Sequence, residues 1–190
     1  MKRSNVRELL EKTIKAFQEI KITREKIDLN AIHCYPLLMS DKLLLIQYLY
    51  DYEVDGYMIV RLKDITSVRS GDLERFSESI IKNEGIIEDI KNPFFQSVEN
   101  WNEVFGKLRV MGNNIIIECE STDHSKFYIG EIIDIHEKSI SLLNFDGLGE
   151  WDEEPTEILY SDITSISFDK RYINIISKYV KQKITDIHFQ

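Results

Sequence analysis

Apolar residues near the start of the chain recur at three- and four-residue intervals, a spacing that places them on one face of a helix. These residues are Val6, Leu9, Leu10, Ile14 and Phe17. Ser4 stands where an N-cap residue would begin that helix. The first 19 or so residues are therefore predicted to form an amphipathic helix. Glutamates along the same segment would oppose an anionic membrane, so we expect the apolar stripe to face the protein core.

The pattern changes from about residue 30 to short apolar runs, which are typical of strands. Runs at 43–50 and 57–62 flank the acidic turn DYEVDG and predict a hairpin. Helical spacing returns after a start signal at 70–72 and ends near Gly85. The residues that carry this spacing are Leu73, Phe76, Ile80 and Ile81.

Residues 92–108 predict a connector helix with Trp101 and Phe105 buried between the two halves of the chain. Beyond Gly112 the strand pattern resumes, and a second closing helix is predicted after Asp169. The connector face comprises Phe94, Val98, Trp101, Phe105 and Leu108, and the closing helix is marked by Tyr172, Ile176, Tyr179 and Val180.

An internal repeat relates the two halves. Residues 62–68 (LKDITSV) match residues 160–166 (YSDITSI), with the string DITS identical. Each segment is followed by an arginine–aromatic pair, Arg75-Phe76 and Arg171-Tyr172, and each is preceded by an acidic turn. Self-similarity of this kind indicates one supersecondary unit used twice. We expect residues 36–83 and 132–180 to superpose.

Short strands at this spacing favour a bent antiparallel sheet over a parallel one, which would need helical crossovers. The predicted fold is α+β and mainly β. It consists of two tandem small antiparallel SH3-like or Sm-like barrels, each with a closing helix, plus the N-terminal and connector helices. The predicted domains are 1–88, with the first helix and barrel, and 89–190, with the connector helix and second barrel.

The strings DGYMIVRLKDITSV and FDGLGEWDEEPTEILYSDITSISF resemble a group of uncharacterised bacterial proteins in which an acidic hairpin precedes a DIT-type strand. The likeness covers most of both halves, but not the first 30 residues or the last six. It implies small SH3-like or Sm-like barrels. It implies no activity, substrate or catalytic residue.

Charge excludes some functions. The chain has a net charge of -9, and this negative potential makes nucleic-acid binding and membrane association unfavourable. Residues 1–30 are the exception, with a mildly basic balance. There is no signal-peptide pattern and no apolar run long enough to span a membrane, so we expect a cytoplasmic protein.

Candidate catalytic and metal-binding residues are sparse. Cys34 and Cys119 lack metal-site spacing and are expected to be buried free thiols. The histidines form no HxH or HExxH pattern, and no cofactor motif is found. The four histidines are His33, His124, His136 and His188.

The segment 146–157 concentrates six carboxylates in twelve residues without the register of a calcium loop. It is longer and more acidic than its counterpart at 51–56, and a turn that only joins two strands needs two to five residues. We therefore predict it to be a partner-binding hairpin with Trp151 as an exposed apolar anchor. A solvated turn is the alternative. The candidate partner-binding residues are Asp146, Glu150, Trp151, Asp152, Glu153 and Glu154.

Three functions compete. The leading hypothesis is a non-enzymatic protein-interaction module, regulatory or immunity-like, with a basic protein as partner and no cofactor. A homo-oligomer is compatible with this hypothesis. The first alternative is an Sm-like RNA-binding protein, which needs a basic or aromatic platform for nucleotides. The second is a hydrolase that uses the carboxylates of 146–157, which requires a concave pocket around them.

Overall fold

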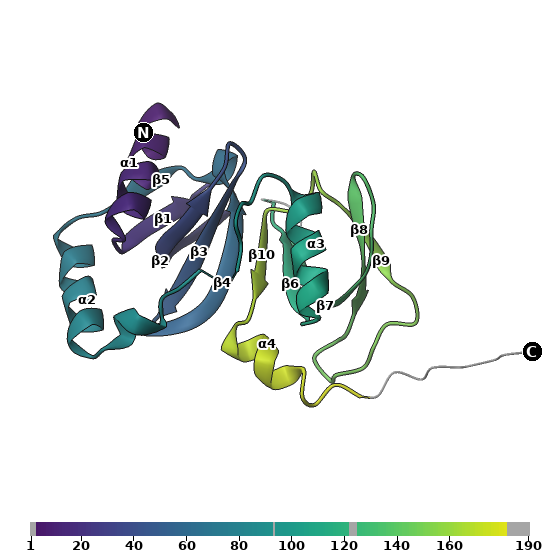
Figure 1. The fold of residues 1–190 in the computed structure, drawn as a ribbon. Coiled ribbons are helices and arrows are strands. Elements are labelled where there is room, and N and C mark those ends of the chain that lie inside the picture. The colour runs from purple at the N-terminus through teal and green to yellow at the C-terminus, as the bar shows by residue number, and fades with distance from the viewer. Residues whose placement is uncertain (1–2, 93, 122–124, 182–190) are drawn as a thin grey trace, which may run out of the picture.

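The computed structural model describes residues 3–92, 94–121 and 125–181. Ten antiparallel strands form one open sheet, with helices packed on it (Figure 1). The strands are β1 (Ile20–Arg24), β2 (Asp28–Met39), β3 (Leu43–Tyr50), β4 (Glu53–Arg61), β5 (Ser67–Arg69), β6 (Ile115–Cys119), β7 (Lys126–Ile135), β8 (Ser139–Asn144), β9 (Thr156–Leu159) and β10 (Ser165–Phe168). The helices are α1 (Arg3–Ala16), α2 (Asp72–Asn83), α3 (Trp101–Met111) and α4 (Arg171–Ile176), with short 3-10 turns η1 (Leu62–Asp64) and η2 (Ile86–Asp89). The fold is therefore α+β and mainly β, as the sequence predicts.

The expectation of two separate barrels is not confirmed, because the sheet runs without interruption through both halves and does not close. Its strand order is β5-β1-β2-β3-β4-β10-β6-β7-β8-β9. Strand β10 pairs with β6 on one side and with β4 of the first half on the other. Main-chain hydrogen bonds thus join the halves, and β5 and β9 are left as the two outer strands.

The two halves have the same strand order, since β5-β1-β2-β3-β4 is matched by β10-β6-β7-β8-β9. Their registers also correspond: Val68 lies opposite Ile22 in the first half, and Ile166 lies opposite Ile117 in the second. Strands β2 and β7 each carry a bulge in their pairing with the next strand. The two DITS segments therefore occupy corresponding places in the sheet.

The threonine of each DITS segment makes the same hydrogen bonds to the main chain of the neighbouring segment. Thr66 donates from its main-chain N–H (2.8 Å) and its Oγ1 (3.1 Å) to the carbonyl of Thr23. Thr164 donates from the same two groups to the carbonyl of Glu118, both at 2.9 Å. In each half the main-chain N–H two residues beyond that carbonyl donates to the threonine Oγ1. These shared bonds give a structural reason for threonine in both DITS segments.

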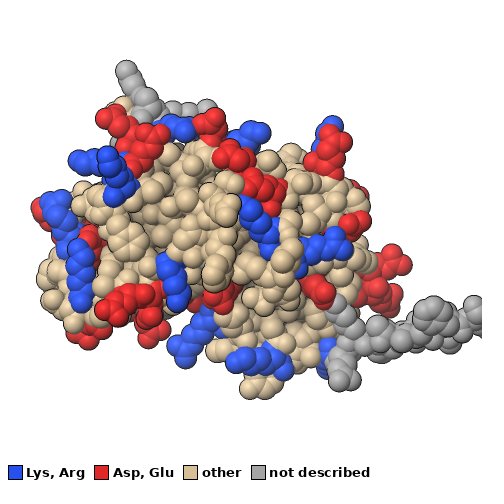
Figure 2. All heavy atoms as spheres, in the orientation of Figure 1, with Lys and Arg blue, Asp and Glu red and all other residues tan. Residues whose placement is uncertain are grey.

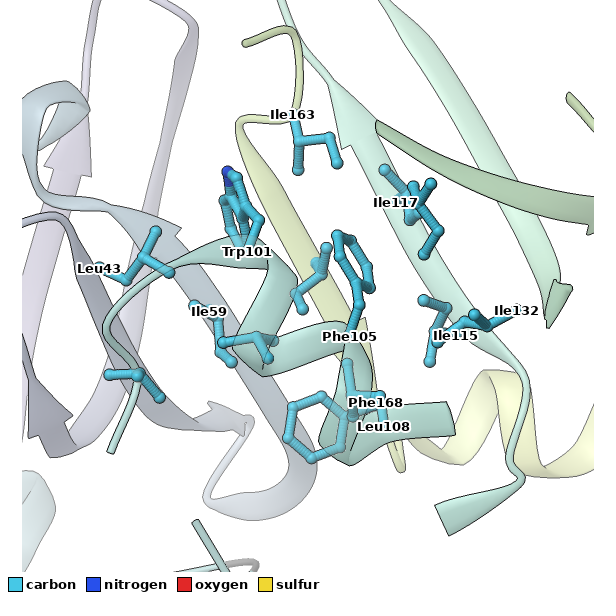
Figure 3. Close-up of a cluster of buried hydrophobic side chains, with 14 of the residues drawn as sticks. Leu43, Ile59, Trp101, Phe105, Leu108, Ile115, Ile117, Ile132, Ile163 and Phe168 are labelled. Carbon is cyan, nitrogen blue, oxygen red and sulfur yellow. The ribbon is translucent and has the colours of Figure 1, made fainter. Parts of the chain in front are cut away.

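Helix α3 packs where the halves meet, and Trp101 and Phe105 are buried there, with exposed fractions of 7% and 0%. The same hydrophobic cluster takes Leu43 and Ile59 from the first half and Ile117 from the second (Figure 3). This confirms the predicted burial of the connector aromatics between the halves. A second cluster lies under α1, where Leu10 is fully buried, so the stripe of α1 faces the core as expected. The helix ends at Ala16, however, and Phe17, predicted to belong to the stripe, is 41% exposed.

The connector helix is shorter than predicted. It begins at Trp101 rather than near residue 92, because the side chain of Asn100 accepts a hydrogen bond from the Glu103 N–H and caps it. Phe94, expected on the buried face, is 96% exposed. At the chain's other predicted cap, Ser4, helix α1 has already begun at Arg3. Periodicity therefore located both helices but misplaced their first residues.

The two closing helices begin where predicted, but α4 ends at Ile176, before Tyr179 and Val180, and several expected core residues of both helices face outward. On α2, Leu73 and Phe76 are exposed and Ile81 is buried. After α4 begins, Tyr172 is half-exposed while its neighbour Ile173 is buried. The sheet that each helix covers, and not the helix pattern alone, decides which face turns inward. No described helix is long and apolar enough to cross a membrane.

Candidate functional site

The predicted acidic hairpin contains a tight turn organised by its own first carboxylate. Phe145 and Trp151 form an isolated bridge at the base of the turn. Between them, Asp146 Oδ1 accepts hydrogen bonds from the main-chain N–H of Glu150 (2.9 Å) and of Leu148 (2.8 Å). These bonds, Glu150 first and then Leu148, lower the pKa of the exposed Asp146 carboxyl below its usual range. Asp146 thus has a local structural role.

Trp151 is not the exposed anchor that the sequence predicts. Its ring is half-buried and meets the buried Phe145 ring edge-on, with the centroids 5.2 Å apart. Its Nε1–H donates to the carbonyl of Lys181 at 2.9 Å, and Glu150 forms an ion pair with the Lys181 ammonium. Trp151 and Glu150 therefore fasten the segment after α4 to the turn. The sequence cannot show this, because Lys181 lies thirty residues further on.

The remaining acids of the hairpin differ in their freedom to meet a partner. Asp152 accepts a hydrogen bond from the Asn144 amide at 3.2 Å. Glu153 and Glu154 are exposed and make no ion pair or hydrogen bond with any described residue. None of the six predicted carboxylates lines the cavity between α1 and α3 or the smaller cavity beside Gly112. Beside β9, the hairpin therefore carries negative charge that can attract a basic partner. Its described acids do not form a pair enclosed in a cavity.

The cysteines are buried and lie in different halves of the sheet, Cys34 in β2 and Cys119 in β6. Burial raises the pKa of both thiols, that of Cys119 to about 11. A thiol with a raised pKa is a poor nucleophile at neutral pH, because the thiolate is the reactive form. Both residues act as small core side chains, as the sequence predicts.

The histidines are not gathered into one site. His33 is half-exposed, and its Nδ1 lies 3.5 Å from the buried carboxylate of Glu19. His136 is exposed and bonds to a serine on the same strand pair. His124 and His188 lie outside the described residues. Within residues 3–92, 94–121 and 125–181, no group of three or more metal-ligating side chains could hold a metal ion.

Two buried carboxylates, Glu19 and Glu74, gave no signal in the sequence. Burial raises the pKa of Glu19, whose Oε2 has no hydrogen-bond partner. Burial also opposes ionisation of Glu74, but hydrogen bonds from Arg69 and from the Gly71 N–H outweigh it and lower its pKa. Neither carboxylate lines either described cavity.

A cavity of about 720 Å³ lies where α1, the turn between β2 and β3, the end of β4 and the start of α3 converge, beside Glu137 and Tyr160 of the second half. We name it the junction groove. Apolar and aromatic side chains supply part of its wall, and charged and amide side chains the rest. Its lining residues are Val6, Arg7, Asp41, Lys42, Leu43, Arg61, Leu62, Lys63, Asn100, Trp101, Asn102, Glu137 and Tyr160. A groove of this size is large enough to enclose a small molecule.

Cations outnumber acids in the groove, although the chain as a whole is acidic. Four lysine or arginine side chains and two carboxylates line it. Both arginines are already held: Arg7 contacts Asp41 at 2.7 Å, and Arg61 pairs with Asp64. The two lysines of the groove make no ion pair with any described residue. The groove therefore presents uncompensated positive charge.

The start of α3 contributes hydrogen-bond donors to the same wall. The Asn102 side-chain amide and the Tyr160 hydroxyl each donate a hydrogen bond to the carbonyl of His136, at 3.0 Å. The Trp101 indole N–H, in contrast, donates to no described residue. Figure 3 shows its nitrogen on the side of the ring turned away from Phe105. Sequence reasoning placed Trp101 in the core but could not show that its polar edge meets a groove.

Comparison of this chain with protein-family models, with curated proteins and with solved structures finds no match, so its interpretation rests on its own geometry.

Proposed function

We propose that the protein is a non-enzymatic interaction module that binds a basic segment of another protein along the open edge of β9. The observation that carries this proposal is that, among residues 3–92, 94–121 and 125–181, no strand covers the outer edge of β9. An uncovered edge presents main-chain donors and acceptors to which an extended peptide can add.

Hydrogen bonding alternates along antiparallel strands, and this alternation determines which main-chain groups of β9 are available to an added strand. The Tyr160 N–H donates to the Lys138 carbonyl at 2.9 Å. In this register the main-chain N–H and C=O groups of the even-numbered residues of β9 point toward β8. The N–H groups of Glu157 and Leu159 then point to the open side. Leu159 is also half-exposed, which gives an added strand an apolar contact.

The first half supplies an internal precedent. Strand β4 has the place in its half that β9 has in the second, and its outer edge is covered by β10. That pairing is antiparallel and extends over four residue pairs, from Val60 with Ser165 to Tyr57 with Phe168. We infer that the halves are two copies of one small SH3-like or Sm-like module, and that β9 keeps free the edge that β4 uses within the chain.

Charge selects a basic partner. The exposed Glu153 and Glu154 directly precede β9, and Glu157 lies within it. Figure 2 shows acidic side chains at the margin of the molecule on the side of β8 and β9. Complementary charge raises the association rate and discriminates among partners. Pro155 lacks an N–H and ends the usable edge, which limits the added strand to about four residues and protects against uncontrolled pairing.

The alternatives have less support. A hydrolase needs a pocket around its acids, and the acids of 146–157 line neither described cavity. RNA binding is opposed by the chain's net charge of -9, which repels a phosphate backbone. A salt titration of RNA affinity tests that alternative directly, because phosphate contacts make affinity fall steeply with salt.

A matched pair of variants tests the edge. Leu159→Pro removes the outward N–H and the side chain, and Leu159→Ala removes the side chain alone. We expect immobilised Leu159→Ala to retain partners from a cell lysate, and Leu159→Pro and Glu153→Lys/Glu154→Lys to lose them. Light scattering of the purified chain would show whether the partner is instead a second copy. Equal capture by folded Leu159→Pro would exclude the β9 edge.

A further inference from the structure

We propose that the junction groove is a second binding site, for a small organic anion that carries an apolar body. This site is separate from the β9 edge and does not depend on the protein-binding proposal. Its volume of about 720 Å³ falls within the range of small-molecule pockets. Its wall includes Val6, Leu43 and Leu62, against which an apolar body can be desolvated.

The anionic end of the ligand is selected by Lys42 and Lys63. Both are exposed at the groove and neither is paired among the described residues. The two arginines of the groove are less available to an anionic ligand, because Arg7 is ion-paired with Asp41 and Arg61 with Asp64. In a chain of net charge -9, unpaired lysines beside an apolar groove form a local reversal of sign.

Trp101 provides the second, independent indication of a ligand. The residue is 7% exposed and lines the groove, yet its indole N–H has no hydrogen-bond partner in the described chain. Trp101 Nε1 is not among the fully buried unpaired atoms of the described residues, so its N–H is accessible from the groove that the residue lines. An acceptor oxygen of a ligand in the groove can therefore receive a hydrogen bond from it.

The start of α3 adds to this preference. No described group accepts from the main-chain N–H of Trp101 or Asn102, the first two residues of the helix. Such N–H groups and the helix dipole favour negative charge at a helix N-terminus. Glu103, which also lies in the first turn, is already paired with Lys107 at 2.5 Å. Its charge is thus partly neutralised within the helix.

One acidic residue limits where the anionic group of the ligand can lie and how many such groups the ligand can carry. Glu137 lines the groove, is exposed and makes no ion pair among the described residues. It would repel an anion placed beside it. The anionic group is therefore expected near Lys42 and Lys63, and we expect one such group per ligand, with the apolar body covering the rest of the wall.

The probe for this site is 8-anilino-1-naphthalenesulfonate, which combines an aromatic body with one sulfonate. Its matched control is N-phenyl-1-naphthylamine, which has the same rings and no charge. We expect one molecule of the sulfonate to bind per chain, and to bind roughly tenfold more tightly than the amine at low salt. Sodium chloride should reduce that difference.

Variants locate the probe. Lys42→Ala/Lys63→Ala should weaken sulfonate binding roughly tenfold or more, while Lys26→Ala, which removes an exposed lysine outside the groove, should leave it unchanged. Trp101→Phe keeps an aromatic ring but removes the N–H, and should weaken binding several-fold.

Energy transfer gives a direct readout of position. In Trp151→Phe, checked for folding by circular dichroism, Trp101 is the sole tryptophan and its emission should be quenched as the sulfonate binds. Leu159→Pro should leave probe binding unaffected, which separates this site from the β9 edge. The proposal is overturned if the lysine double variant binds the sulfonate as wild type does, or if the amine binds equally well.

Discussion

A buried ion pair between Arg24 and Glu120 ties the first half of the chain to the second, and its removal is a sharp test of how the halves are held. The Arg24 guanidinium meets the Glu120 carboxylate through two hydrogen bonds of 2.7 and 2.9 Å. The two side chains are 2% and 12% exposed. Glu120 Oε2 also lies 2.6 Å from Thr164 Oγ1, whose one proton it shares with the Glu118 carbonyl, and a second carboxylate, Asp28, lies 3.8 Å from Arg24.

The magnitude depends on which partner is removed. Glu120→Ala leaves a buried guanidinium whose Nε already has no partner, with Asp28 as the nearest compensating charge. Removing one partner of a buried pair typically costs about 3 to 5 kcal/mol. Arg24→Met leaves the more accessible carboxylate with its Thr164 bond, so we expect a smaller loss of about 1 to 3 kcal/mol.

The double variant Arg24→Met/Glu120→Leu removes both charges and retains apolar volume. We expect its free energy of unfolding to lie within about 1 kcal/mol of wild type, because the attraction in a buried pair is largely offset by desolvation. Urea unfolding followed by far-ultraviolet circular dichroism gives the free energy of unfolding of wild type and of the three variants. A loss below about 1 kcal/mol for Glu120→Ala would show that Arg24 regains water, and hence that the junction is open in solution.

Three further predictions concern the core, a buried acid and two glycines. Trp101→Ala should lower the free energy of unfolding by about 3 to 5 kcal/mol, whereas Phe76→Ala, at a 65% exposed position, should cost under about 1 kcal/mol in the same urea assay. Because burial raises the pKa of Glu19, the folded state holds that proton more tightly than the unfolded chain, and this contribution to stability declines as pH rises from about 4.3 to the folded pKa. Glu19→Gln should remove that decline in thermal melts between pH 4.5 and 7, and an unaltered pH dependence would contradict the assignment. Gly130→Ala should destabilise by about 1 to 3 kcal/mol or more, since the new Cβ would lie 1.9 Å from a main-chain oxygen of β8, while Gly106→Ala, in open space on α3, should stabilise by about 0.5 to 1 kcal/mol; equal melting temperatures would refute this contrast.

The local pattern of apolar and polar residues was enough to predict many of the strands and helices. The strand pattern beyond Gly112 predicted the strand that contains Ile117, and three- to four-residue spacing located the helix that buries Trp101 and Phe105. The two DITS strings were recognisable as equivalent because each threonine must satisfy the same main-chain groups of a neighbouring strand. These features depend on residues close in sequence, or on the string DITS, which occurs twice in the chain.

Strand pairing across the halves was decided only by the tertiary structure. Nothing in the residues of β10 shows that β4, some hundred residues earlier, covers its second edge. Two closed barrels and one open sheet satisfy the same alternation, because a buried strand has the same apolar face whichever neighbour completes its hydrogen bonds.

The candidate sites show the same division. The sequence determined that Glu153 and Glu154 carry exposed charge, since a run of acids cannot be buried without partners. It could not reveal that Trp151 is turned inward by Lys181, or that Lys42, Lys63 and Trp101 share one groove. Side chains far apart in the chain meet only when helices and strands pack, because a groove is a property of surfaces brought together and not of any segment.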